Sequence, residues 1–240
     1  MHVSKERGAG AIALIDPDSK NDNILYKLIS LINKCDFDFI FVGGSMISDN
    51  EFDTRIKFIK DNSNLPLIIF PGSFNQLSKY ADAILYLSLI SGRNPQYLIG
   101  EHVKSAPLIY NLSIETIPTG YILLDGGIRS SVEVVSDTKP IPMDQHDIIL
   151  AHALASQYLG KSLIFLESGS GAKEHPNCEI VRYLKSYLSI PIIVGGGIKT
   201  AKTAKSLVES GANFIVISTI LENIINEYDL IKLTESIHSC

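Results

Sequence analysis

The chain carries eight short apolar runs at regular intervals, and most of them lead through turn residues into a segment with helical spacing. Hydrophobicity within each run is continuous rather than alternating, which is typical of strands buried on both faces of a parallel sheet. The runs cover residues 11–15, 39–42, 67–70, 83–87, 121–124, 163–166, 192–194 and 214–217. We therefore expect eight parallel strands.

Polar residues and glycines gather where these runs end, for example Asp16, Ser45, Asp125, Glu167 and the glycines of 195–197. The carboxyl ends of parallel strands meet at one edge of a sheet, so these residues should share one rim. Eight βα units in sequence predict a (β/α)8 barrel, the TIM-barrel fold, as a single domain over residues 1–240.

Two stretches depart from this rhythm. Residues 100–120 contain Pro107 and Pro118 and show little helical periodicity, so we expect the helix before strand five to be replaced by an extended segment. Residues 125–162 hold a long polar loop before a helix expected at 144–158. Long loops on the rim of a barrel commonly serve function.

Composition narrows the class of protein. The net charge of −5 argues against a general nucleic-acid binder, which normally presents a basic face. Three cysteines without metal-like spacing suit reduced thiols in a cytoplasm. The polar start of the chain does not resemble a signal peptide, and apolar runs fall short of the ~20 residues that span a bilayer. We expect a cytoplasmic protein with at most peripheral membrane contact.

The run from Phe165 to Gly171 is the most informative segment for chemistry. An apolar strand ends in Glu167, and a glycine-rich turn follows at once. Such turns let backbone N–H groups approach an anion. Glycines 195–197 after strand seven, and Ser218 with Thr219 after strand eight, add two further loops where these barrels often bind phosphate. The same glycines are also compatible with tight turns alone.

Asp16 and Ser45 end neighbouring strands and offer hard oxygen ligands of the kind that Mg²⁺ takes beside a substrate diphosphate. Helix capping is the alternative role for both residues. Asp125, at the end of strand five, either reaches the cavity or satisfies its own glycine turn.

Five motifs occur together in one order along the chain. They are Ile15-Asp16-Pro17-Asp18, Phe41-Val42-Gly43-Gly44-Ser45, Ile117-Pro118-Thr119-Gly120-Tyr121, residues 165–171 and residues 194–198. With them the whole chain resembles the geranylgeranylglyceryl phosphate synthase family, which includes PcrB-type heptaprenylglyceryl phosphate synthases. The resemblance implies a Mg²⁺-dependent prenyltransferase of ether phospholipid biosynthesis. It would transfer a geranylgeranyl group from its diphosphate to the 3-hydroxyl of sn-glycerol 1-phosphate.

The resemblance also implies roles for residues. Asp16 and Ser45 would hold the Mg²⁺ that bridges the diphosphate, and Glu167 would be the catalytic base. The residues expected around sn-glycerol 1-phosphate are Phe165, Leu166, Glu167, Ser168, Gly169, Ser170, Gly171, Gly196, Gly197, Ser218 and Thr219. The family further implies a homo-oligomer, either a hexamer or a dimer.

Several positions depart from the family pattern. The family usually has Tyr at position 165, Ala at 168 and Gly-Asn at 218 and 219, and its lysine after the Asp-Pro-Asp motif is displaced here to Lys20. Three alternatives stay open. The donor is a longer, heptaprenyl diphosphate; or the barrel is a sugar-phosphate isomerase that pairs Glu167 with Asp125 or Asp16; or it is an inactive barrel kept for binding.

Overall fold

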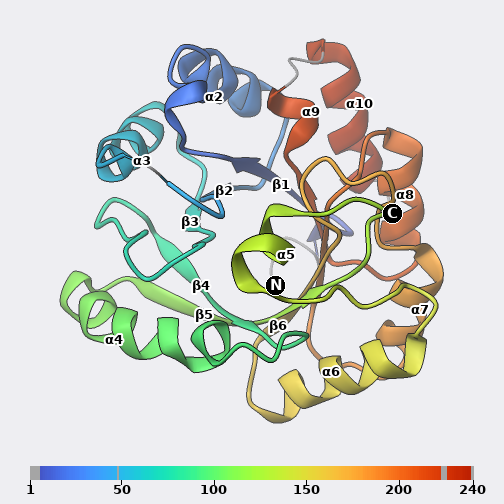
Figure 1. The fold of residues 1–240 in the computed structure, drawn as a ribbon. Helices are drawn as coiled ribbons and strands as arrows, with labels where there is room; N and C mark the ends of the chain where they lie inside the picture. The colour runs from blue at the N-terminus through green and yellow to red at the C-terminus, as the bar shows by residue number, and fades with distance from the viewer. Residues whose placement is uncertain (1–5, 48, 223–225, 239–240) are drawn as a thin grey trace.

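The computed structural model describes residues 6–47, 49–222 and 226–238. Eight parallel strands form a closed barrel in chain order, and β8 pairs back with β1 (Figure 1). The strands are β1 (Gly10–Ile15), β2 (Phe39–Val42), β3 (Leu67–Ile69), β4 (Ala83–Leu89), β5 (Glu115–Leu123), β6 (Leu163–Glu167), β7 (Ile192–Gly195) and β8 (Phe214–Ile217). The predicted (β/α)8 barrel is thereby confirmed.

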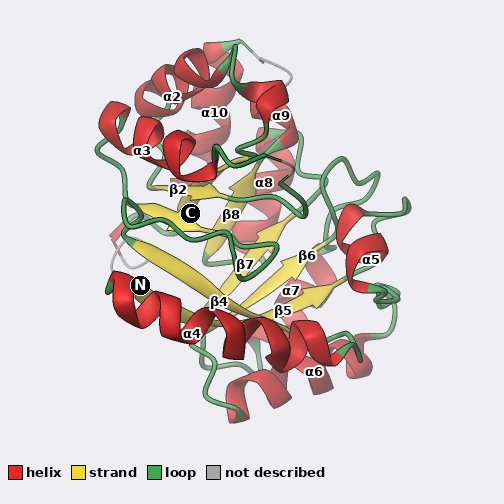
Figure 2. Cartoon of the chain, turned by 60° about the vertical axis from the view of Figure 1, so that its left-hand side comes forward, coloured by secondary structure: helices red, strands yellow, loops and turns green. Residues whose placement is uncertain are grey.

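Helices surround the barrel, as Figures 1 and 2 show. They are η1 (Ser19–Asn21), α2 (Leu25–Lys34), α3 (Phe52–Asn62), η2 (Gln96–Gly100), α4 (Glu101–Leu112), α5 (Ser131–Ser136), α6 (His146–Tyr158), α7 (Cys178–Lys185), α8 (Ala201–Glu209), α9 (Thr219–Glu222) and α10 (Glu227–His238). Among the described residues, none of the helices is long and apolar enough to cross a membrane.

The barrel separates two apolar layers because successive side chains of a strand point to opposite faces. In β6, Ile164 and Leu166 pack outward under the helices, whereas Phe165 points into the barrel. There Phe165 stacks on Phe70, with ring centroids 5.2 Å apart, and contacts Tyr121 at 5.4 Å. These aromatic rings fill the interior below the rim, so the barrel is a packed core rather than a channel.

The prediction of an extended segment in place of a helix before strand five is wrong. Residues 101–112 form α4, with Pro107 inside it, and η2 leads into it as one turn of π-helix. Pro107 lacks the N–H that would bond the carbonyl of Val103, but both residues lie on the exposed side of the helix, where solvent can hydrogen-bond that carbonyl. His102, Ser105 and Ile109 form the buried face. Because other exposed positions are also apolar, the helical period is hidden in the sequence.

The connection without a helix lies one unit earlier. Residues 70–82 join β3 to β4 and contain no helix, all of them being described. The extended character expected near Pro118 belongs to β5, which begins six residues before the predicted start. The helix expected at 144–158 is α6, which begins at His146. The short helix α5, in the long loop after β5, was not predicted, and it lies in front of the barrel opening in Figure 1.

Candidate functional site

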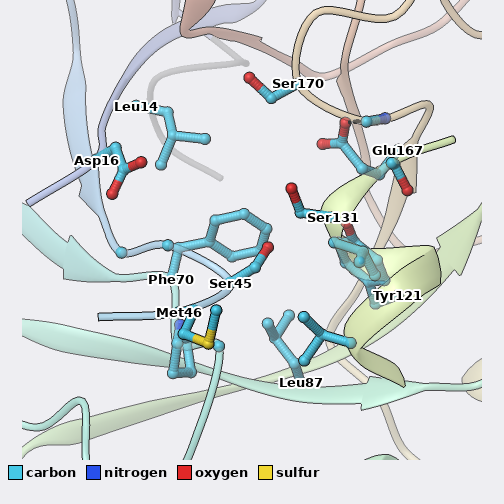
Figure 3. Close-up of a pocket in the computed structure, with 18 of the residues that line it drawn as sticks. Leu14, Asp16, Ser45, Met46, Phe70, Leu87, Tyr121, Ser131, Glu167 and Ser170 are labelled. Carbon is cyan, nitrogen blue, oxygen red and sulfur yellow. Dashed lines mark hydrogen bonds between the residues drawn. The ribbon is translucent and has the colours of Figure 1, made fainter. Parts of the chain in front are cut away.

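A large pocket opens at the carboxyl rim of the barrel (Figure 3). Its volume is about 720 Å³, within the range usual for small-molecule sites. One end is polar and lies among the loops after β1, β6, β7 and β8, where Asp16 and Glu167 approach from opposite sides (Figure 3). The other end is an apolar arm beside β4. A pocket of this kind suits an amphiphilic ligand with a charged head.

Glu167 is the last residue of β6 and points into the barrel mouth. It is only 6% exposed, and its Oε1 accepts a 2.6 Å hydrogen bond from the backbone N–H of Gly169. Burial disfavours the charged form and raises the pKa of Glu167 to about 7, although the bond from Gly169 opposes this effect. A carboxylate with a pKa near neutrality is suited to accept a proton from a substrate hydroxyl.

The turns around Glu167 require glycine. Gly169, Gly171, Gly196 and Gly197 all have positive φ angles, between 68° and 96°. A Cβ on Gly196 would lie 2.5 Å from Oε1 of Glu167 and under 3 Å from the amide nitrogens of Ser168 and Gly169. The loops after β6 and β7 therefore pack backbone to backbone. Successive glycine turns of this type present N–H groups to an anion.

Gly196→Ala is expected to lower the melting temperature strongly and to abolish activity, because it combines a strained φ of 85° with a clash against Glu167. Gly160→Ala is the matched control, since Gly160 has φ of 78° with nothing within 4 Å of a Cβ. The control should lose only the ~1–2 kcal/mol of left-handed strain and keep its activity. Equal melting temperatures for the two variants would contradict this account of the turn.

Asp16 stands at the end of β1 and is not a helix cap. The cap of η1 is Asp18, whose side chain accepts from the N–H of Lys20. Oδ2 of Asp16 accepts a 3.0 Å bond from Nζ of Lys20, while its Oδ1 is buried and has no hydrogen-bond partner. A buried carboxylate oxygen without a partner is costly unless a ligand satisfies it.

Ser45 follows β2, which pairs with β1, and it lines the same pocket as Asp16. It does not cap α3, because that helix begins seven residues later with Glu51 at its N-cap. Between the two, Gly44 leaves room for Asp16, since a Cβ there would lie 2.6 Å from Oδ1. One carboxylate and one hydroxyl fit Mg²⁺, which binds few protein ligands and completes its shell with phosphate oxygens and water. The described residues hold no cluster of three or more His, Cys, Asp or Glu side chains that could bind a metal ion.

The apolar arm leaves the barrel interior beside β4. Residues from both faces of this strand line it, since Leu85 and Leu87 belong to the inner layer and Ile84 and Tyr86 to the outer one. His102 of α4 also lines it. These residues form an apolar groove beside β4. Tyr97 also lines the pocket.

The structure brings most of the predicted site residues together. Those that line the pocket are Asp16, Ser45, Glu167, Gly169, Ser170, Gly196, Gly197, Ser218 and Thr219. Four others do not line it, namely Phe165, Leu166, Ser168 and Gly171. Phe165 lies in the barrel core and Leu166 under the helices, so their side chains do not reach the polar end. The N–H of Gly171 instead donates to Oγ1 of Thr219 at 3.2 Å, which joins the loop after β6 to the start of α9.

Sequence reasoning missed the contribution of α5. Ser130, Ser131, Val132 and Val135 line the pocket, and Ser130 packs against the turn at Gly169. Oγ of Ser130 accepts a 3.1 Å bond from the N–H of Glu133. The signal was present in the sequence, because Ser130 followed three residues later by Glu133 is the pattern of a capping box.

Asp125 lies outside the pocket. It lines a separate open depression with Asp144, Glu174 and Glu179, and its Oδ1 accepts a 2.9 Å bond from the N–H of Gly127. The turn-forming alternative for Asp125 is therefore correct. The two carboxylates therefore line different cavities, which argues against an isomerase that pairs Glu167 with Asp125.

Comparisons with known proteins place the chain in one family. A family model described as the PcrB family matches residues 1–235. Geranylgeranylglyceryl phosphate synthase of Chitinophaga pinensis is 41% identical over 98% of this chain and 93% of its own length. The enzyme of that name from Pyrococcus horikoshii is 42% identical over 92% of this chain and 87% of its own.

A solved structure shares the fold in detail. It is (S)-3-O-geranylgeranylglyceryl phosphate synthase from Thermoplasma acidophilum in complex with the substrate sn-glycerol-1-phosphate. Its TM-score is 0.93 at 37% identity, covering 100% of this chain and 98% of the other. Thiamine phosphate pyrophosphorylase from Pyrococcus furiosus, at 12% identity and a TM-score of 0.61, shares the fold alone. By sequence over nearly its whole length, this chain belongs to the PcrB family.

Proposed function

We propose that this protein is a prenyltransferase that joins the geranylgeranyl group of geranylgeranyl diphosphate to the 3-hydroxyl of sn-glycerol 1-phosphate. The observation that carries this function is the position of Glu167. It stands among the glycine turns at the polar end of a pocket whose other end is apolar, so that a small phosphorylated alcohol and a long apolar chain would share one cavity with this carboxylate. The relatives at about 40% identity bear the name of this activity.

The reaction would use the polar end as follows. The glycine turns after β6 and β7 and the start of α9 hold the glycerol phosphate beside Glu167. The bond between the allylic carbon and the diphosphate oxygen breaks, and diphosphate leaves with the electron pair. The 3-hydroxyl oxygen forms the new ether bond to that carbon, and Glu167 accepts the hydroxyl proton.

Asp16 and Ser45 are the residues that would hold Mg²⁺ at the diphosphate, supported by the unpartnered Oδ1 of Asp16. Bound there, the ion would neutralise charge on the departing diphosphate. Lys20, bonded to the other oxygen of Asp16, and Lys199 add positive charge along the pocket. The cytoplasmic location and the homo-oligomeric state stay predictions.

The test is product formation from radiolabelled sn-glycerol 1-phosphate and Mg²⁺ with geranylgeranyl or heptaprenyl diphosphate. We expect a prenyl ether from geranylgeranyl diphosphate, no product with EDTA, and strong preference over sn-glycerol 3-phosphate. Preference for the heptaprenyl donor would revise the chain length only. No product with either donor would contradict the transferase and favour an isomerase or an inactive barrel.

A further inference from the structure

Arg55 of α3 is a buried cation that makes two bidentate ion pairs. Its exposed fraction is 5%. Nε and Nη2 donate to the two oxygens of Asp22 at 2.6 and 2.9 Å. Nη1 and Nη2 donate to the two oxygens of Asp49 at 2.7 and 2.8 Å, and Nη1 also donates to the carbonyl of Pro17 at 3.1 Å. All five N–H donors of the guanidinium are thereby used.

The partners of Arg55 come from two different loops of the rim. Pro17 and Asp22 belong to the loop after β1, directly beyond Asp16. Asp49 belongs to the loop after β2, four residues beyond Ser45. Arg55 lowers the pKa of both aspartates, so the two ion pairs persist at neutral pH. One side chain from a third element thus ties the two loops that carry the candidate metal ligands.

A second buried side chain fixes the other flank of the Ser45 loop. Gln76 is 3% exposed, donates to the carbonyl of Gly44 at 2.8 Å and accepts from the N–H of Gly72 at 3.0 Å. It therefore joins the loop after β2 to the loop after β3. Arg55 joins the same loop to the one after β1, a connection that Gln76 does not provide.

We propose that Arg55 is a positioning residue that holds Asp16 and Ser45 at the mutual geometry required to bind Mg²⁺ and the prenyl diphosphate. This inference rests on the proposed function. Two ligands on separate loops bind a small cation well only if their backbones are already in place, because ordering them at binding costs conformational entropy. A fully bonded guanidinium supplies that order without touching the metal or either substrate.

Arg55→Lys is the first variant, because lysine keeps the charge but cannot pair bidentately with two carboxylates. We expect the half-saturating Mg²⁺ concentration and the KM for prenyl diphosphate to rise about tenfold, as for other supporting residues of metal sites. The KM for sn-glycerol 1-phosphate should stay within twofold. In the metal-free protein, amide hydrogen exchange should accelerate at residues 16–22 and 43–47 but not at 167–171 or 195–197.

Arg7→Lys is the matched control. Arg7 also bonds two aspartates, Asp36 and Asp38, but does so at the amino end of β2, away from the rim. This control should lower thermal stability and leave both KM values unchanged. Asp49→Asn is the milder second variant if Arg55→Lys fails to fold, and it should shift the same constants in the same direction by a smaller factor.

A lower melting temperature for Arg55→Lys, with both KM values and the Mg²⁺ titration unchanged, would assign Arg55 a structural role only. Different measurements test the proposed function and the positioning role of Arg55. Absence of product from the wild-type protein would overturn the function. Exchange rates at 16–22 and 43–47 that match those of the wild type would overturn the positioning role, whether or not the protein turns over.

Discussion

Glu167→Gln is expected to reduce kcat by about 10²–10⁴, the usual worth of a positioned general base. The variant keeps the shape and the hydrogen-bonding capacity toward the N–H of Gly169, which bonds Oε1 in the wild type at 2.6 Å. It removes only the ability to accept the proton of the attacking hydroxyl. Steady-state rates with both substrates saturating measure the effect, and a loss of less than tenfold would contradict the role of Glu167 as base.

The pH dependence of the wild-type enzyme gives a second test of the same residue. Glu167 must be ionised to act as a base, so kcat/KM should rise with pH and level off above about 7, the pKa that burial imposes. Bound phosphate adds negative charge nearby and should move the midpoint of the kcat profile higher still. A kcat/KM that does not change between pH 5 and 8 would contradict the role of Glu167 as the base.

As the pH rises, the free energy of unfolding should fall, whereas the activity should increase. The pKa of Glu167 is raised in the folded protein from 4.5 to about 7, so between these pH values the folded state binds more protons than the unfolded state. The protonated form of Glu167 therefore contributes to stability below pH 4.5, and this contribution is lost as the pH rises to 7. At about 1.4 kcal/mol for each pH unit, the loss is about 3 kcal/mol. Glu167→Gln should therefore melt at a higher temperature than the wild type at pH 8, and at nearly the same temperature at pH 4.5.

Asp16→Asn is expected to reduce kcat/KM by about 10²–10³, because charge neutralisation by a metal is worth several kcal/mol and each 1.4 kcal/mol is a factor of ten. The amide keeps the volume beside Gly44 but lacks the negative charge that attracts Mg²⁺. The requirement for Mg²⁺ should rise in parallel, and direct titration of the metal in the presence of the prenyl diphosphate measures it.

Asp125→Asn is the control for Asp16→Asn, because it removes a carboxylate from the same rim but outside the pocket. Its remaining side-chain oxygen can still accept from Gly127, so activity should stay within twofold of the wild type. Equal losses in the two variants would point to the overall charge of the rim rather than to a metal ligand. A large loss of transferase activity in Asp125→Asn alone would contradict the placement of Asp125 outside the functional site.

The strands and the rim residues were predictable because their signals are local. A strand buried on both faces must be continuously apolar, and the residue that ends it must lie at the rim, which placed Asp16, Ser45 and Glu167 correctly. The helix α4 was not predictable from its pattern, because a proline and exposed apolar residues such as Tyr110 hide its period. It exists because His102, Ser105 and Ile109 pack inward, and that contact is tertiary.

Side-chain direction limited the prediction of the site. A motif names consecutive residues, whereas a strand sends alternate side chains to opposite faces, so Leu166 within the motif cannot reach the ligand with its side chain. The two bidentate ion pairs of Arg55 were equally hard to predict from the sequence. Asp22, Asp49 and Arg55 are unremarkable charged residues along the sequence, and only the fold brings them within hydrogen-bond distance.

The helix-free connection between β3 and β4 decides where a long substrate can go. The stacked rings of Phe70 and Phe165, with the tilted ring of Tyr121 against them, close the route down the barrel axis. A hydrophobic tail entering at the rim would therefore turn sideways over the edge of the closed barrel beside β4, because residues from both faces of that strand border the pocket. The reacting head would then stay at the barrel mouth, while the tail would lie along the one side of the described barrel where the strand-to-strand connection contains no helix.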